Sequence, residues 1–387
     1  MESLTELLRP FAEEAGLRAQ EFEEQGFISQ DFADRLAETG LFRLCNVSDL
    51  GGLDGSAMDY ARVTEMMAEQ DASAAWVLFI GITSALSHTN LNPEEIKAVF
   101  KRGRAITAGV FAPMGRAIPT VQDGEEGFLL SGQWQWGSGI RNSGFVSAGG
   151  FVVDETGDLL KDEAGRPDQR SFLLDVSDVE ILDTWDVSGL KGTGSADFRV
   201  ENLFVPVRRT FTLSSEGPDN RPVSRFPVFG FLAIGITAVA LGIAKAAIAE
   251  LTDIAKAKTP QGSRKTLALR STTQIRLATS HARLKAARLL VFSEIESLWQ
   301  EAESDREVGV EARRDLRLAL TYAVQECADI VRDMYTLGGG SSVYSKNLLQ
   351  RHFRDIHVVQ QHMMVNENTL ELVGRLFLDI DVSTEQL

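Results

Sequence analysis

Cysteine and histidine are scarce in this sequence, and their scarcity excludes several kinds of site. The 387 residues include only two cysteines, Cys45 and Cys327, which lie far apart without a Cys-x-x-Cys pair, and only five histidines. Two isolated cysteines provide neither a disulfide framework nor a structural zinc site. We therefore expect no metal site, and we expect the chain to work in a reducing cytoplasm.

Positive charge is also in short supply. The chain carries 55 acidic against 39 basic side chains, a formal net charge of −16. Such a surface repels nucleic acid and anionic membranes, so we expect neither as a partner. The first residues, MESLTELLRPFAEEAG, have acids every few positions where a secretory signal needs a basic start and an apolar core, so we expect no export.

One long uncharged run, VFGFLAIGITAVALGIA at residues 228–244, approaches the length of roughly 18 to 20 apolar residues that spans a bilayer. The run contains three glycines and a threonine, and Lys245 and Glu250 continue its helical pattern. We interpret it as a helix buried in the middle of a bundle and not as a membrane span.

The hydrophobic pattern changes twice along the chain and divides it into three predicted domains. Residues 1–104 have helical spacing throughout. Residues 105–215 follow a two-residue period broken by Gly, Asp and Pro, which predicts an antiparallel sheet. After a loop rich in turn formers, helical patterns return in residues 225–387. The predicted fold class is α+β, mostly α.

Local signals predict individual helices within these domains. The stretch Asn-Pro-Glu-Glu at 92–95 supplies an N-cap, a first-turn proline and two acids for a helix that runs to Phe100. Residues 264–302 and 309–337 are each long enough for a bundle helix. The triple glycine at 338–340 is predicted to end the second of these helices.

Three stretches carry a resemblance that covers essentially the whole chain. They are ALGIAKAAI (240–248), WDVSGLKGTGSADFRVENLFVP (185–206) and QRHFRDIHVVQQH (350–362). Together with the order of the domains, they resemble the acyl-CoA dehydrogenase superfamily of flavoproteins. The resemblance implies an N-terminal helical domain, a central antiparallel β domain and a C-terminal four-helix bundle.

Fold alone does not choose between the dehydrogenase and monooxygenase branches of this superfamily. In the dehydrogenases the catalytic base is commonly a glutamate eight residues beyond the aspartate of an Arg-Asp pair. Here Asp355 is that aspartate, and eight residues beyond it stands Met363, which cannot take a proton. His362, one position earlier, resembles the active-site histidine of two-component flavin monooxygenases such as dibenzothiophene monooxygenase and the 4-hydroxyphenylacetate hydroxylases.

The stretch WQWGSGIRNSGF at 134–145 is similar to a flavin-contacting segment of those monooxygenases. By the two-residue period Trp134 and Trp136 share one face of a strand that ends in glycine. The resemblance implies that Ser138 lies against the flavin near its N5 edge. There it would protect a flavin C4a-hydroperoxide, which survives only where water is excluded and its polar atoms are hydrogen-bonded.

A second glycine-rich loop, GLKGTGSADF at 189–198, is implied to lie beside the same flavin. By itself such a loop is usually only a turn, and a dinucleotide fingerprint is excluded because no βαβ unit follows. The residues expected to line the cofactor are Trp136, Ser138, Gly139, Trp185, Thr193 and Ser195.

Four side chains are candidates for catalysis, namely His362, Ser138, His88 and Ser84. A group that titrates near neutrality, such as His362, can hydrogen-bond the hydroperoxide or deprotonate the substrate. Ser84 falls where the aromatic hydroxylases carry a further histidine, and His88 follows one turn later on the same face. That departure indicates a substrate unlike a phenol. His357, five residues before His362 on a predicted helix, is equally well explained as a structural residue.

One absence bears on the cofactor. The dehydrogenases usually carry an Arg-x-x-Phe-Gly segment that helps a neighbouring subunit hold FAD, but residues 255–267 read AKAKTPQGSRKTL. This favours an exchangeable, reduced flavin, FMN or FAD, supplied by a separate NAD(P)H flavin reductase. Arg264 and Lys265 remain candidates for a phosphate contact.

We therefore predict a flavin-dependent oxidoreductase, in the first place a monooxygenase component that uses O2 to oxygenate a small, partly apolar substrate of open identity. One alternative is an acyl-CoA dehydrogenase with Glu367 as base, because a shift of one helical turn keeps a residue on the same face. A second is a non-catalytic relative of the fold. Because the run 228–244 is too apolar to be left open, we expect a homotetramer.

Overall fold

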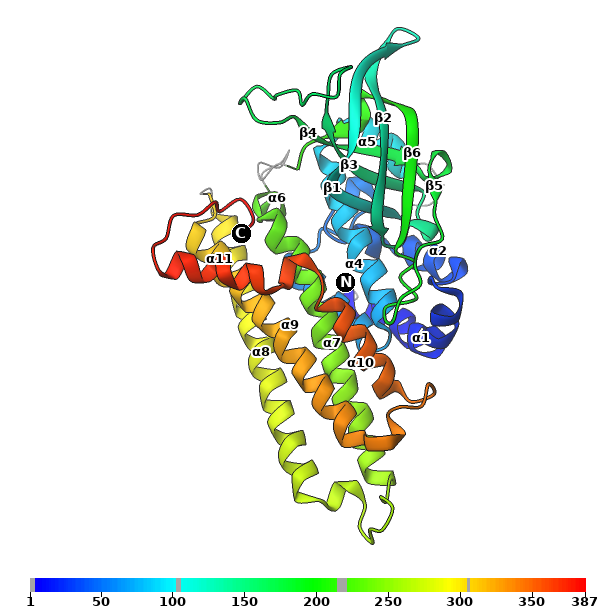
Figure 1. The fold of residues 1–387 in the computed structure, drawn as a ribbon, viewed down its shortest axis with the longest axis vertical. Helices are drawn as coiled ribbons and strands as arrows, with labels where there is room; N and C mark the ends of the chain where they lie inside the picture. The colour runs from blue at the N-terminus through cyan, green and yellow to red at the C-terminus, as the bar shows by residue number, and fades with distance from the viewer. Residues whose placement is uncertain (1–3, 102–105, 214–220, 305–306) are drawn as a thin grey trace.

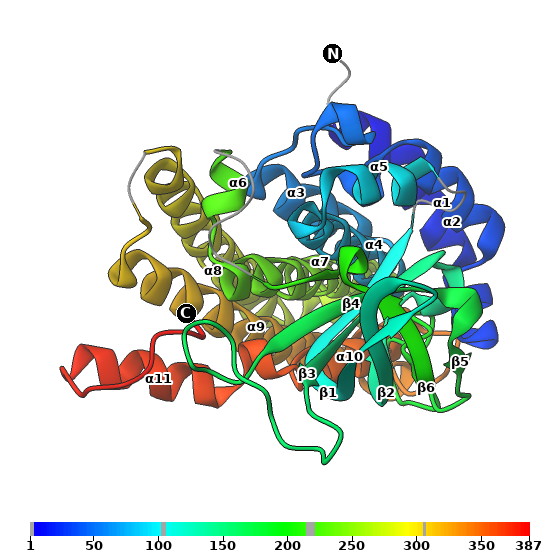
Figure 2. The same cartoon turned by 90° about the horizontal axis from the view of Figure 1, so that it is seen from above.

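The computed structural model describes residues 4–101, 106–213, 221–304 and 307–387. Helices from both ends of the chain surround one end of a twisted sheet, and the longest helices extend away from it (Figures 1 and 2). The predicted domain boundaries at 104/105 and at 215 fall outside the described residues.

The N-terminal part is helical, as its spacing predicts. A side-chain capping box between Ser56 and Asp59 starts α3, and Asp71 accepts a hydrogen bond from the Ala74 amide at the start of α4. Asn92 caps α5 in the predicted way, since its side chain accepts from the amide of Glu94. The helices are α1 (Leu4–Gln25), α2 (Gln30–Glu38), α3 (Ala57–Ala68), α4 (Ala72–Ser87) and α5 (Pro93–Lys101).

A seven-stranded sheet follows, in the order β5-β6-β2-β1-β3-β4-β7. The prediction of a purely antiparallel sheet is wrong, because β1 and β3 are parallel. The hairpin β1–β2 reverses direction once and the chain reverses again into β3, which pairs on the other side of β1. The strands are β1 (Thr107–Gln122), β2 (Glu125–Gly137), β3 (Phe145–Val152), β4 (Gln169–Asp175), β5 (Glu180–Ile181), β6 (Ala196–Pro206) and β7 (Thr210–Phe211).

Helices form the C-terminal part of the chain. The two predicted bundle helices are present, although α8 begins at Ser271 and not at 264. After α9 the chain turns at Gly339, whose φ of 60° is a left-handed conformation. The α-helices are α6 (Pro222–Arg225), α7 (Val228–Ala257), α8 (Ser271–Glu303), α9 (Val310–Gly338), α10 (Leu348–Val359) and α11 (Glu367–Phe377).

The apolar run 228–244 lies in α7, which packs against α3, α4, α9 and α10. Two helical segments, Ala72–Asn90 and Val228–Ala257, are long and apolar enough to cross a membrane by composition alone, and 83% of the apolar window of each is buried inside the protein. The prediction of a buried helix is confirmed. The same burial removes the reason given for an oligomer, because the chain's own helices already cover this surface.

The segment after α10 departs from the predicted helix. The α-helix ends at Val359, and a single 3-10 turn, η9 (Met363–Val365), separates it from α11. His362 is the N-cap of η9, so His357 and His362 do not share a helix. Glu367 begins α11 beyond this break. A shift of one helical turn therefore does not bring Glu367 to the position of Met363, because no continuous helix joins the two residues.

Candidate active site

Three of the predicted side chains are joined in one chain of hydrogen bonds, which we call the hydroxyl chain (Trp76, Ser138, Ser195, Thr193 and the carbonyl of Leu190). Trp76 Nε1 donates to Ser138 Oγ at 3.1 Å, and Ser138 Oγ lies 2.7 Å from Ser195 Oγ. Ser195 Oγ lies 2.7 Å from Thr193 Oγ1, which donates to the Leu190 carbonyl at 2.9 Å. All three hydroxyls are buried.

An irregular strand end brings these hydroxyls together. Trp136 has a φ of 64°, and the pairing of β2 with β6 shifts register between Trp134 and Gly137. Consequently the two tryptophans do not share a face, since Trp134 is 0% exposed and Trp136 is 67% exposed. Gly139, also left-handed at φ 73°, donates its amide to the Thr193 carbonyl at 2.9 Å and so joins the two glycine-rich segments.

His362 lies beside the same cluster. Its ring packs against Trp76, with the ring centroids 5.9 Å apart. The amide of Met364 donates to His362 Nδ1 at 3.2 Å, so the proton of the neutral imidazole is on Nε2. Burial and the nearby charge of Arg317 lower the pKa of His362 to about 4. At neutral pH the ring is therefore uncharged and offers a donor at Nε2.

Arg317 is an unusual neighbour for a histidine. Its side chain is buried in α9, and within the described residues no carboxylate forms an ion pair with it. Within the described part of the chain its guanidinium makes two long contacts, 3.4 Å to the Phe229 carbonyl and 3.3 Å to the Thr369 hydroxyl, and its Nε has no acceptor there. Burial lowers the pKa of Arg317 to about 10, so it keeps its charge at neutral pH.

The loop that carries Thr193 and Ser195 is fastened to α10. Asp355 accepts a hydrogen bond from the Leu190 amide at 2.7 Å, and Trp185 Nε1 donates to the Leu190 carbonyl at 3.2 Å. A Cβ on Gly189 would lie 2.5 Å from the backbone of Arg354, so only glycine permits this approach. Burial raises the pKa of Asp355 to about 7. Gly189 is therefore explained by the close packing of this loop against α10.

The second-rank candidates Ser84 and His88 make their contacts at the sheet. A Cβ on Gly109 of β1 would lie 3.0 Å from the Ser84 hydroxyl. His88 is fully buried, and its Nε2 lies 2.8 Å from Ser147 Oγ of β3. Burial lowers the pKa of His88 to about 3, so its imidazole is neutral in the folded protein. Neither side chain is hydrogen-bonded to the hydroxyl chain, and their catalytic roles stay predictions.

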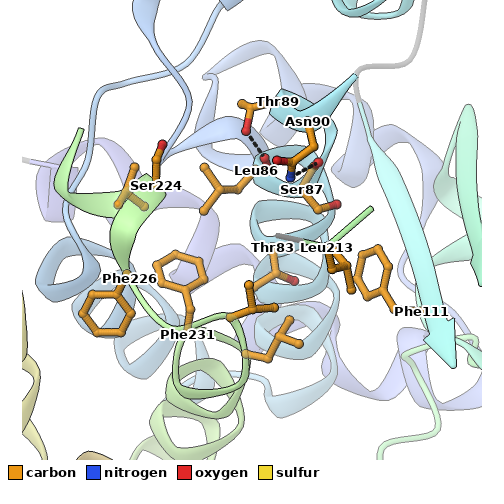
Figure 3. Close-up of a pocket in the computed structure, with 13 residues that line it drawn as sticks. Thr83, Leu86, Ser87, Thr89, Asn90, Phe111, Leu213, Ser224, Phe226 and Phe231 are labelled. Atoms are coloured by element: carbon orange, nitrogen blue, oxygen red, sulfur yellow. Dashed lines mark hydrogen bonds between the residues drawn. The ribbon is translucent and has the colours of Figure 1, made fainter. Parts of the chain in front are cut away.

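A pocket lies further along α4 (Figure 3). Thr83 and Ser87, which line it, follow Trp76 by two and three turns on the same face of the helix, so the pocket begins about 10 Å from Trp76 along the axis. Its volume is ≈ 570 Å³, including its opening to solvent. The lining residues are Thr83, Leu86, Ser87, Thr89, Asn90, Phe111, Leu213, Val223, Ser224, Phe226, Val228, Phe231 and Leu232.

The remaining sequence candidates lie apart from the hydroxyl chain. His357 Nδ1 is 2.6 Å from the Phe353 carbonyl on its own helix, and its ring packs on Phe353. Glu367 is exposed in the first turn of α11. Arg264 and Lys265 are exposed in the loop between α7 and α8, at the end of those helices far from the sheet (Figure 1). In the described residues no cluster of three or more His, Cys, Asp or Glu side chains offers a metal site.

Sequence reasoning missed Trp76 and Arg317. Trp76 lies in an apolar run. A buried indole N–H needs a hydrogen-bond acceptor, but the sequence does not show which residue provides it. Arg317 looks like any polar residue in a helical pattern. Its burial depends on the packing of α7 and α11 over α9, which no local pattern reveals.

Known proteins match this chain in sequence and in structure. Residues 1–96 match the acyl-CoA dehydrogenase N-terminal domain, and residues 234–367 match the acyl-CoA dehydrogenase C-terminal domain. The indole-3-acetate monooxygenase of Pseudomonas putida is 30% identical over 362 residues, which are 93% of this chain and 90% of that protein. The oxygenase component of p-hydroxyphenylacetate 3-hydroxylase from Acinetobacter baumannii is 24% identical over 396 residues, 98% of this chain and 90% of that protein.

A solved structure has the same fold. XiaF from a Streptomyces species, in complex with FADH2 and glycerol, superimposes with a TM-score of 0.84 at 22% identity and covers 97% of both chains. At this identity the match shows that the two chains share a fold.

Proposed function

Because this chain belongs to the acyl-CoA dehydrogenase family and is a flavin-dependent monooxygenase within it, we propose that it is an oxygenase component whose hydroxyl chain and His362 hold a reduced flavin. A separate NAD(P)H flavin reductase would supply that flavin, as the name of the p-hydroxyphenylacetate relative, an oxygenase component, suggests. The observation that carries the proposal is the meeting of Ser138, Ser195, Thr193 and His362 around Trp76.

The polar atoms of the hydroxyl chain fit a flavin ring. The edge of an isoalloxazine alternates hydrogen-bond donors and acceptors and carries no large charge, and the hydroxyl chain likewise offers neutral polar atoms in buried surroundings. Trp76 gives the hydroxyl chain an apolar neighbour, and its side chain is only 7% exposed. We propose that Ser138 and Ser195 meet the polar edge of the ring, while Thr193 holds Ser195 in place and Gly139 and Trp185 support the backbone.

Bound reduced flavin supplies the two electrons with which O2 gives one oxygen atom to the substrate and one to water. The chain's own contribution is electrostatic and steric. His362 is neutral with its proton on Nε2, so it donates a hydrogen bond to a nearby oxygen atom and is a poor base at that nitrogen. Of the two predicted roles for His362, the hydrogen-bond partner is the one we propose.

We propose the pocket on α4 as the site of the organic substrate. Phe111, Phe226 and Phe231 give it an aromatic lining, and Thr83 and Ser87 of α4 add hydroxyls. None of its lining residues in the described part of the chain is charged. An uncharged, aromatic small molecule fits such a lining better than a carboxylate, because a buried carboxylate needs a cationic partner.

The test is oxygen-isotope labelling. Purified protein is mixed anaerobically with photoreduced FMN or FAD, given ¹⁸O2, and offered indole, indole-3-acetate and other small aromatics in parallel. The proposal predicts one ¹⁸O atom in a product, with indole used better than its acetate. Reoxidation of the flavin to hydrogen peroxide with every compound would contradict the monooxygenase function. Preference for the acetate would contradict only the uncharged pocket.

Assembly and location are further parts of the proposal. Two large side chains on one side of α8, Ile275 and Leu289, are 65% and 58% exposed and lie about four turns apart. Exposed apolar side chains in a row support contact with another copy of the chain, and we propose a homotetramer. We also propose that the protein acts in the cytoplasm, where its reductase partner would have access to NAD(P)H.

A further inference from the structure

The number of available protons fixes the direction in which hydrogen bonds are donated along the hydroxyl chain. A hydroxyl has a single proton to donate, and Thr193 gives its proton to the Leu190 carbonyl, which cannot donate in return. Ser195 must therefore donate to Thr193, and Ser138 must donate to Ser195. Trp76 Nε1 can only donate, so it points into Ser138 from the other end. Every proton in the chain is used.

The Ser138 and Ser195 oxygens keep free lone pairs. In this arrangement Ser138 and Ser195 can accept a hydrogen bond from a ligand and have none to donate. Reversing the chain would free the Ser138 proton for a ligand, but Thr193 would have to give up the Leu190 carbonyl. Trp76 cannot take the returned proton, because an indole N–H is no acceptor. Reversal therefore loses one buried hydrogen bond.

We propose that Thr193, through its bond to the Leu190 carbonyl, determines the redox specificity of the flavin site, an inference that rests on the proposed function. Reduced isoalloxazine carries a proton on N5, whereas the oxidised ring has a bare, accepting nitrogen there. A hydroxyl chain that can only accept a hydrogen bond matches the N5 proton of the reduced ring. With the oxidised ring, a lone pair of the serine oxygen would face the lone pair of N5, which is unfavourable. Thr193 is thus a positioning residue, which acts on the ring through Ser195 and Ser138.

The test compares the dissociation constants of the full-length protein for oxidised and for photoreduced FMN and FAD. Thr193→Val removes the hydroxyl and keeps the shape, so Ser195 and Ser138 become free to turn toward the oxidised ring. The ratio of the oxidised to the reduced constant should fall about two- to tenfold, the worth of one hydrogen bond. Thr193→Ser keeps the hydroxyl and should keep the wild-type ratio.

Two further variants guard against a structural effect. Ser195→Ala cuts the chain between Thr193 and Ser138, and it should lower the ratio in the same sense. Thr64→Val is a matched control in α3, because the Thr64 hydroxyl is buried without a hydrogen-bond partner in the described residues. It should leave both constants unchanged.

The outcomes separate this inference from the proposed function. If the wild type binds flavin and Thr193→Val weakens both redox forms by the same factor, Thr193 is only structural and the inference is overturned. An unchanged ratio in Ser195→Ala overturns it as well. A wild type that binds neither form of either flavin overturns the proposed function and the inference together.

Discussion

Single residues set the protonation state of this site. Burial and the charge of Arg317 both disfavour the imidazolium form of His362, whose pKa falls to about 4. We predict that Arg317→Met raises the pKa of His362 toward its ordinary value near 6.5, whereas Arg317→Lys, which keeps a positive charge, does not. The measurement is the NMR titration of the His362 ring. Identical midpoints in wild type and Arg317→Met would show that the charge has no influence.

His88 makes the stability of the fold depend on acid. Its pKa is lowered to about 3 in the fold and is near 6.5 unfolded, so its stabilising effect is complete above pH 6.5 and is lost as the pH falls toward 3. Over that range wild type should lose on the order of 4 kcal/mol more unfolding free energy than His88→Gln. Urea denaturation across the pH range measures this. Parallel curves for the two proteins would refute the assignment.

Residue types in the sequence predicted that three hydroxyls from two segments would lie together, and the structure has them together. Ser138, Thr193 and Ser195 were expected beside one ligand, and they lie within one hydrogen-bonded chain. Hydroxyls among glycines signal a site because a packed core has little use for them. Trp76 and Arg317 gave no comparable signal, because their environment is made by segments distant in sequence.

Among the elements, α10 holds the loop before β6 in place. Asp355 holds the Leu190 amide, and the Leu190 carbonyl ends the hydroxyl chain. We predict that Asp355→Ala destabilises the protein by about 1–3 kcal/mol and exposes the Leu190 amide to hydrogen exchange. Asp355→Asn retains an acceptor oxygen and should preserve the protection. Exchange at Leu190 that is equally slow in Asp355→Ala would contradict this.

Gly189 gives a second test of the contact between α10 and the loop before β6. A methyl group there would lie 2.5 Å from the backbone of Arg354, so Gly189→Ala must push the loop away from α10. We predict weaker binding of both reduced and oxidised flavin, measured by anaerobic and aerobic titration. Gly374→Ala is the control, because a Cβ on Gly374 meets nothing within 4 Å. Wild-type affinity in Gly189→Ala would refute the need for close approach.

Elements were predicted better than the way they join. Capping and periodicity gave α5, α7 and α9 nearly as they are, because these signals are local. The two-residue period says which side chains share a face but not the direction of the neighbouring strand, so the parallel pair β1–β3 was missed. The left-handed turn at Trp136 likewise broke the period that predicted two tryptophans on one face.

The whole molecule leaves apolar surface on α8 uncovered. Wild-type protein should elute with a mass near four times the 42.4 kDa of one chain. Leu289→Glu, which adds one negative charge on that surface, should shift the mass downward, while Gln122→Glu adds the same charge at the exposed end of β1 and should leave the mass unchanged. Light scattering after gel filtration gives these masses. A wild-type mass of one chain would contradict the proposed assembly.

The hydroxyl chain and His362 are together proposed to form the site of a reduced flavin. The most direct measurement is a crystal structure of the protein grown anaerobically with reduced FMN or FAD. We expect an isoalloxazine ring whose N5 edge is hydrogen-bonded to Ser138 or Ser195, with His362 beside it and the α4 pocket next to it. A ring bound elsewhere on the molecule, with the hydroxyl chain untouched, would contradict the claim.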